Sequence, residues 1–214
     1  MKTPLLVGLL FLALQSFSQS NKFTFGFEVS PNFTNIDRNS LYALWYPEYG
    51  FRPAFNMDIK AEYQASKHLV ITAGVGYLTT REFVILDTNL QDIERIESDR
   101  FHSYVFLPAG VKYYFGDFFI SPEIGIGWNT ANTTKTTYRR SNGYSSSKGD
   151  DINNLYKVNA VTYPIFFSFG NDIDMKSYSI SLGVKAYYSL NSVGNDDSNY
   201  GHYYGFGVLA GVSF

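Results

Sequence analysis

Hydrophobic and polar residues alternate along most of this chain with a period of two. The alternation is sharpest over 54–65, where apolar residues at odd positions are separated by polar residues at even positions. The apolar set is Phe55, Met57, Ile59, Ala61 and Tyr63, and the polar set is Asn56, Asp58, Lys60, Glu62 and Gln64. A period of two predicts β-strands with one apolar and one polar face, and no segment keeps a helical period.

Eight segments of about ten residues show this alternation, as the strands of a transmembrane barrel do. They are 22–33, 54–65, 69–81, 101–115, 118–130, 156–169, 176–190 and 202–214. The segment 156–169 fits least well, because Val158 and Phe166 fall on its inner face. The pattern predicts an all-β fold, an eight-stranded antiparallel up-and-down transmembrane β-barrel. Because the number of strands is even, both termini are expected in the periplasm.

The connections between these segments alternate in length, which matches the short periplasmic turns and long extracellular loops of outer-membrane barrels. The short connections are 66–68, 116–117 and 171–174, and the long ones are 34–52, 83–100, 131–155 and 191–201. Gly116-Asp117 has the composition of a two-residue hairpin turn.

The N-terminus reads as a secretory signal peptide. Lys2 is followed by an apolar run from Leu5 to Leu14 and by the small-residue site Ser16-Phe17-Ser18. The run is about half of the ~20 residues that a membrane helix needs. We therefore expect a signal peptide over 1–18, a barrel domain over 19–214 and a location in the cell outer membrane.

Composition supports export and narrows the chemistry. The chain has no cysteine, which excludes disulfides and thiolate metal sites, and its net charge of −2 gives no basic stripe for nucleic acid. The mean hydropathy of −0.14 is too polar for a helical membrane protein, whereas the aromatic content of 18% is high. A barrel reconciles these values, because only alternate residues face lipid. No cofactor is expected.

Seven charged residues fall on the inner faces of the predicted strands. They are Glu28, Asp58, Lys60, Glu62, Lys112, Glu123 and Lys185. Extending the hairpin registers places Lys60 opposite Gly74, Asp58 opposite Gly76 and Glu123 opposite Gly110. An eight-stranded barrel has room inside only for side chains, so we expect paired charges that plug the lumen. The alternative is a path for protons or ions.

The tract FLPAGVKYYFGDFFISPEIGIG over 106–127, with Pro108 pointing inward, resembles the Bacteroidota outer-membrane β-barrel domain family, which includes the PorT-like proteins. The resemblance implies an outer-membrane barrel, in some members one needed by a secretion system of that phylum. It brings no catalytic residue.

Two further features concern partners and assembly. A basic, tyrosine-containing patch in the loop 131–155 is a candidate contact for lipopolysaccharide phosphates or a protein, although a solvated loop explains it more simply. It comprises Lys135, Tyr138, Arg139 and Arg140. An outward series at the C-terminus ends on an aromatic residue and predicts a signal for the barrel-assembly machinery. It includes Tyr204, Phe206, Val212 and Phe214.

Three function classes follow from these features. The first is a non-enzymatic barrel, structural or an accessory subunit of an envelope or PorT-like secretion machine, in contact with outer-membrane lipid, lipopolysaccharide and other envelope proteins. The second is a narrow porin-like channel. The third is a lipid-modifying enzyme at the outer rim, for which His102 with Ser103 or Asp99 is the candidate set.

Overall fold

The computed structural model describes residues 22–37, 48–90, 93–143, 145–149, 158–192 and 201–214. The predicted signal peptide, 1–18, lies outside the described residues. Within the described part of the chain no helix is long and apolar enough to cross a membrane.

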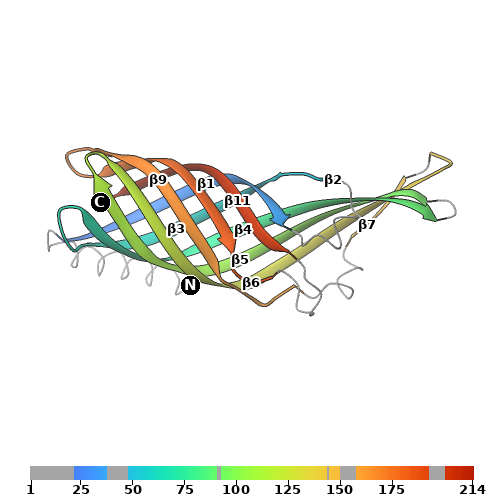
Figure 1. Ribbon diagram of the computed structural model, residues 1–214, viewed down its shortest axis with the longest axis horizontal. Helices are drawn as coiled ribbons and strands as arrows, with labels where there is room; N and C mark the ends of the chain where they lie inside the picture. Colours follow the sequence, from blue (N-terminus) through green and yellow to red (C-terminus); the bar gives the residue numbers. More distant parts are fainter. Residues whose placement is uncertain (1–21, 38–47, 91–92, 144, 150–157, 193–200) are drawn as a thin grey trace, which may run out of the picture.

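Eight antiparallel strands close into a ring, which confirms the predicted fold class (Figure 1). In ring order they are β1 (Phe23–Asp37), β3 (Arg52–Gln64), β4 (Leu69–Leu90), β5 (Ile93–Phe115), β6 (Phe118–Arg140), β9 (Pro164–Asp174), β10 (Ser179–Ser189) and β11 (His202–Ser213). Three short strands pair outside this ring: β2 (Glu48–Tyr49) with β4, and both β7 (Ser145–Gly149) and β8 (Val161–Thr162) with β6.

The ring is closed by the first and last strands. Phe25 and Phe214 exchange two backbone hydrogen bonds of 3.0 Å at one end of this seam. Further along the seam, the Phe51 ring lies 5.3 Å from the Phe206 ring and 5.8 Å from the Tyr204 ring. Chain ends that are far apart in sequence thus seal the barrel.

Two of the three predicted turns are confirmed. Residues 66–68 connect β3 to β4, and Gly116-Asp117 connects β5 to β6, with Gly116 at a φ of 70° that favours glycine. The predicted turn at 171–174 is wrong. These residues continue β9 and pair with β10, and the turn closes instead where the Met175 N–H donates to the Tyr178 carbonyl at 2.8 Å.

The predicted loops 83–100 and 131–155 are also wrong over much of their length. Strands β4 and β5 pair with each other up to Leu90 and Ile93, and β6 continues to Arg140 before β7 folds back on it. These segments lack a regular alternation of apolar and polar residues, but ladder hydrogen bonds with their neighbours keep them extended. We call one part of the sheet the external ribbon: β4 after Arg81, β5 before Phe101, β6 after Asn132, and β7. It projects from one end of the barrel (Figure 1).

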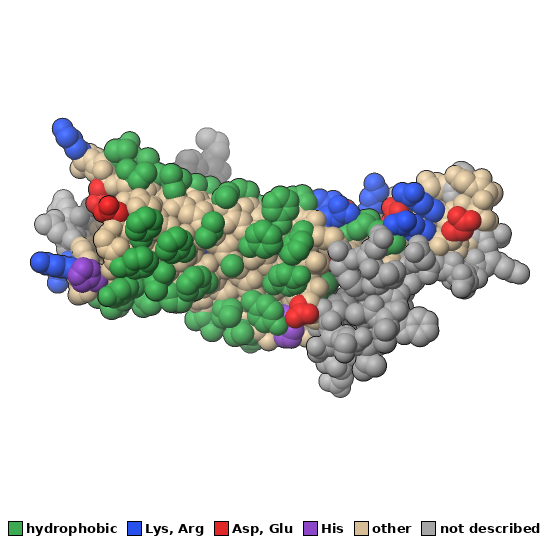
Figure 2. Space-filling view, turned by 45° about the horizontal axis from the view of Figure 1, so that its top comes forward, with side chains coloured by type: hydrophobic (Ala, Val, Ile, Leu, Met, Phe, Trp, Pro, Cys, Tyr) green, Lys and Arg blue, Asp and Glu red, His purple; other side chains and the backbone are tan. Residues whose placement is uncertain are grey.

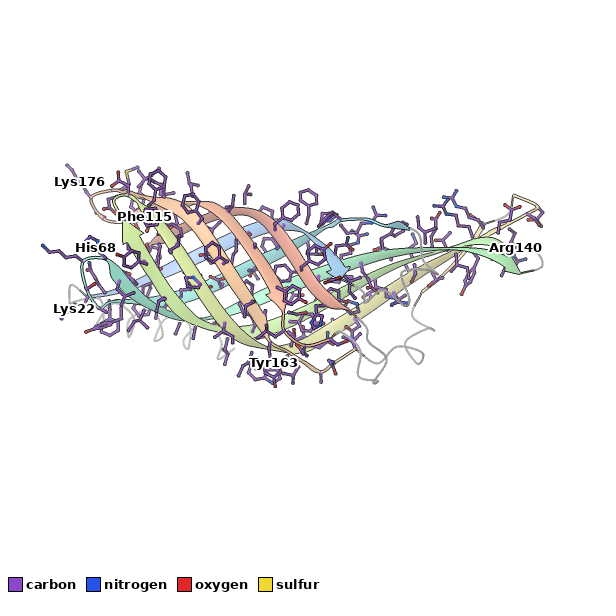
Figure 3. The ribbon with its side chains drawn as sticks, viewed as in Figure 1. Lys22, His68, Phe115, Arg140, Tyr163 and Lys176 are labelled. Carbon is purple, nitrogen blue, oxygen red and sulfur yellow. The ribbon has the colours of Figure 1, made fainter. Side chains whose placement is uncertain are left out.

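The two ends of the molecule are distinct. Lys22, His68, Phe115 and Lys176 lie at the end with the short turns, and Arg140 lies at the tip of the ribbon (Figure 3). The wall between them carries apolar side chains, with charged residues gathered towards the ends (Figure 2). Ile59 lies near the middle of β3 and is 55% exposed, and Ile124, six residues along β6 from Phe118, is 54% exposed. A bilayer requires such an apolar outer band of a barrel.

Candidate functional site

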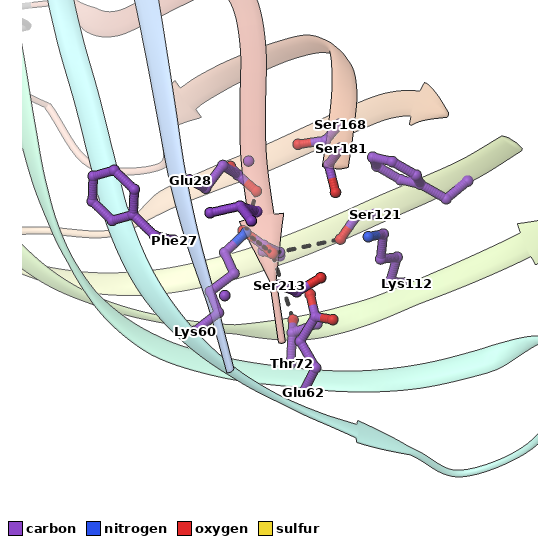
Figure 4. Close-up of a pocket in the computed structure, with 15 residues that line it drawn as sticks. Phe27, Glu28, Lys60, Glu62, Thr72, Lys112, Ser121, Ser168, Ser181 and Ser213 are labelled. Carbon is purple, nitrogen blue, oxygen red and sulfur yellow. Dashed lines mark hydrogen bonds and ion pairs between the residues drawn. The ribbon is translucent and has the colours of Figure 1, made fainter. Parts of the chain in front are cut away.

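The barrel interior holds a cluster of five charged side chains. The Lys60 ammonium lies 2.6 Å from Glu123 Oε1 and 3.0 Å from Glu28 Oε2. The Lys185 ammonium contacts Glu28 and lies 3.1 Å from Asp58 Oδ2. Figure 4 shows Lys60 reaching towards Glu28 inside the barrel. We call these five residues the lumen charge cluster.

The cluster ties together strands from different parts of the ring, the neighbours β1 and β3 with β6 and β10. Its members come from β1, β3, β6 and β10, and all five side chains are largely buried. Desolvating five charges costs much free energy, which mutual pairing offsets only while every partner is present. Each member therefore depends on the others.

The predicted register around the cluster is confirmed. Lys60 pairs with Gly74 and Asp58 pairs with Gly76 across β3 and β4, and Gly110 pairs with Glu123 across β5 and β6. A Cβ at Gly76 would lie 2.3 Å from the Phe106 ring and 2.9 Å from Asp58 Cβ. Glycine at 76 thus makes room for an aromatic ring as well as a charged residue.

A second polar group lies on the side of the short turns. Asp172 Oδ2 accepts hydrogen bonds from Lys112 Nζ at 2.6 Å and from the Tyr114 hydroxyl at 2.5 Å, and its Oδ1 accepts one from Ser181 at 2.6 Å. The Lys112 ammonium also lies 4.1 Å from the centre of the Phe119 ring. Lys112 is therefore paired outside the lumen charge cluster.

Asp172 was missed in the sequence because it fell in the wrongly placed turn. The period of two through Phe166, Ser168 and Gly170 would have found it on the inner face. Glu62, by contrast, lies at the mouth of the barrel, where the Thr24 hydroxyl donates to it at 3.4 Å. Between the two polar groups a cavity of about 20 Å³ has space for about one water molecule.

An aromatic layer lies inside the barrel on the other side of the lumen charge cluster. Phe106 is fully buried, its ring lies 5.1 Å from the Phe166 ring, and that ring lies 6.0 Å from Tyr187. The buried apolar cluster comprises Ile36, Leu78, Tyr104, Phe106, Phe166, Tyr187 and Tyr203. Lys185 Nζ lies 5.0 Å from the centre of the Phe166 ring, so the two layers are in contact.

Of this layer, the sequence pattern places Tyr104 on the inner face of its strand and Phe166 on an inner face as an irregularity. The signal was present, because the same inward period brings Tyr104 and Phe106 to the interior of β5. The prediction of a lumen plugged by paired charges did not include a bulky apolar layer.

The candidate rim residues are not brought together as a catalytic set. His102 Nδ1 lies 2.7 Å from Asn132 Oδ1, whereas Asp99 receives two hydrogen bonds from Arg81, at 2.8 and 2.5 Å. Within the described ranges the Ser103 hydroxyl has no hydrogen-bond partner. The rim-enzyme alternative therefore gains no support from geometry.

The basic patch predicted for a loop lies on strand β6 of the external ribbon. Arg139 is exposed and lies 3.0 Å from Glu97, which also lies 3.3 Å from Arg95. Lys135 pairs in register with Asp99 and is exposed. Tyr138 is half-buried on the opposite face of the strand from Arg139, and Arg140 is exposed at the tip. The ribbon thus presents a charged face with both signs rather than a purely basic one.

The described geometry is that of a closed barrel with a charged extension. No protein-family model and no curated protein matches this chain. Among solved structures, it is similar to Ail, the attachment invasion locus protein of Yersinia pestis, at 10% identity over 90% of this chain and 99% of that chain, with a TM-score of 0.42. It is similar to a major outer membrane protein from Thermus thermophilus, at 14% identity over 90% and 98% of the two chains, with a TM-score of 0.41.

A third similar structure is Neisserial surface protein A, at 12% identity over 89% of this chain and 95% of that chain, with a TM-score of 0.37. Similarities at this level carry no functional argument. The function has to come from the residues of this chain.

Proposed function

We propose that this chain is a closed, non-enzymatic outer-membrane β-barrel that serves as a structural or accessory subunit of the envelope and holds the external ribbon outside the membrane. The observation that carries the proposal is the double block of the lumen. The aromatic layer around Phe106 and the lumen charge cluster lie one above the other, so a hydrated ion meets both.

The outer surface supports the membrane location. The rings of Phe115, Phe118 and Phe169 stack on the exterior at centroid distances of 6.0 to 6.3 Å, near the short turns. Trp128 is exposed ten residues along β6 from Phe118. Aromatic girdles flank the apolar band of outer-membrane barrels, whose tilted strands span it in about 9–11 residues.

The external ribbon supports a binding role. Its strands are long and paired, and its charges are held by neighbouring charges, as in the Arg139–Glu97 pair. A preorganised surface loses little conformational entropy when a partner binds. Lipopolysaccharide phosphates and other envelope proteins are the partners proposed here, including a secretion machine of the kind that the PorT-like resemblance implies.

Two experiments test the proposal. In planar bilayers the purified protein should show no steady open current, and such a current would overturn the closed barrel in favour of the narrow channel. Affinity purification from native membranes should recover a partner protein or lipopolysaccharide. Reversing the charges of the ribbon in a Lys135→Glu, Arg139→Glu, Arg140→Glu variant should remove it.

The matched control reverses three lysines at the other end of the barrel. Lys22, Lys67 and Lys176 are all exposed there, so Lys22→Glu, Lys67→Glu, Lys176→Glu changes the net charge equally. Loss of the partner from both triple variants would show that net charge, and not the ribbon, is responsible.

A further inference from the structure

The outer wall carries a groove of about 560 Å³ across β5, β6, β9 and β10. Its volume lies within the range of about 300–1,000 Å³ for small-molecule sites. Small or cyclic residues form its centre, whereas most of the wall carries bulky ones. The central residues are Ala109 on β5, Pro122 on β6 and Ala186 on β10. Ile124, Ile165 and Phe167 rise beside them, and Phe167 is 53% exposed.

The strand ladder is incomplete next to the groove. The Gly110–Glu123 and Tyr113–Ile120 pairs keep one register, but β5 and β6 form no ladder pair between them. Pro122 lies in this gap of the ladder and has no N–H to donate, which removes one hydrogen bond between the strands. A Cβ at Gly110 would lie only 2.3 Å from the Pro122 carbonyl oxygen, so the strands stay close and the groove comes from the short side chains on the wall.

The height of the groove restricts what can enter it. Pro122 is four residues along β6 from Phe118 in one girdle and six residues from Trp128 at the other. A soluble ligand does not reach this level, which lies in the hydrocarbon part of the bilayer. The groove is lined almost entirely by apolar side chains, so its occupant is a hydrocarbon chain.

The outer end of the groove is polar. Tyr188 lines it and stacks on His202, with ring centroids 5.2 Å apart and an interplanar angle of 17°. The His202 ring is held by a contact of 2.9 Å between its Nδ1 and the Ser189 carbonyl oxygen. Tyrosine and histidine present an apolar body with a polar tip, which suits the boundary between acyl chains and headgroups.

From these features we infer that the groove binds one acyl chain of an outer-leaflet lipid, with the headgroup at the Tyr188–His202 pair. This inference rests on the proposed outer-membrane location. It adds a specific lipid site to a wall that otherwise contacts lipid without preference.

The test is native mass spectrometry of the full-length protein extracted from outer membranes in mild detergent. The native barrel should carry one bound lipid. Ala109→Phe and Ala186→Phe fill the groove and should abolish the lipid-bound peak. Val184→Phe is the matched control, because Val184 is 54% exposed on β10 outside the groove and should leave the peak unchanged.

Each other outcome overturns the site. Absence of bound lipid from the native barrel, or equal loss in the groove and control variants, would refute it. A native dimer that Ala186→Phe dissociates would show instead that the groove is an interface between two copies. Fractionation of the same samples separates the two proposals: a chain absent from the outer membrane contradicts the proposed function, whereas a correctly located barrel without lipid contradicts only the groove site.

Discussion

Lys60 of β3 and Glu123 of β6 meet inside the barrel with 2.6 Å between Nζ and Oε1, although two other strands separate them in the ring. Both are almost fully buried. Their contact crosses the lumen and so joins wall segments that share no backbone hydrogen bond.

Removal of the Lys60 charge should strongly destabilise the barrel. Lys60→Met leaves Glu123 and Glu28 short of a cation, and breaking a buried pair in this way costs about 3–5 kcal/mol. Urea unfolding in lipid vesicles, followed by tryptophan fluorescence, measures the change. Lys176→Met in the exposed turn is the control and should cost little. The double variant Lys60→Met, Glu123→Gln should cost less than the sum of the two single changes, and strict additivity would contradict the coupling.

The aromatic layer gives a matched pair of neighbouring residues. Phe166 faces the lumen and is buried, whereas Phe167 faces lipid. Phe166→Ala should cost about 3–5 kcal/mol, because it leaves a cavity that the packed interior cannot fill. Phe167→Ala should cost less, since lipid chains can occupy the vacated space. Equal costs in the same unfolding assay would argue against a packed lumen.

Lipid exposure of the outer face predicts the effect of a new charge. Ile124→Arg places a cation on the apolar wall between the levels of Phe118 and Trp128 and should cost about 2–4 kcal/mol, the depth-dependent cost at the bilayer midplane. Thr133→Arg is the matched control, because Thr133 is exposed on the same strand in the external ribbon. If both substitutions are equally mild, the apolar face of β6 does not contact the bilayer core.

The seam between β1 and β11 predicts a role for the last residue. Phe214→Asp should lower the fraction of folded protein in the outer membrane, because a charge would replace the apolar ring at the closing Phe25–Phe214 pair. Phe214→Tyr should keep insertion close to the native level. The heat-modifiable band on gels measures the folded fraction. Normal insertion of Phe214→Asp would count against an assembly signal at this end.

Cysteine labelling can establish the orientation, because the native chain has no thiol. Cysteine in place of Thr133 or Ser141 should react with an impermeant maleimide on intact cells. Cysteine in place of Lys67 or Asp117, in the two short turns, should react only after the outer membrane is permeabilised. The opposite pattern would place the termini outside the cell.

The sequence by itself determined the strands, their faces and two hairpin registers. The period of two in β3 fixed which side chains face inward, and the short connection at Gly116-Asp117 fixed how β5 meets β6. A shift by one residue would have moved every charge in these strands to the lipid face, so this part of the pattern allowed one solution.

The tertiary structure decided which inward residues meet and where strands end. Pairing of Lys60 with Glu123 depends on the curvature of a closed ring, which no local pattern encodes. The external ribbon has no regular alternation of apolar and polar residues, and only its pairing with neighbouring strands keeps it extended. For the same reason the sequence pattern placed Asp172 in a turn. Its position in β9 is fixed by the register with β10, and the sequence alone does not show that these two segments pair.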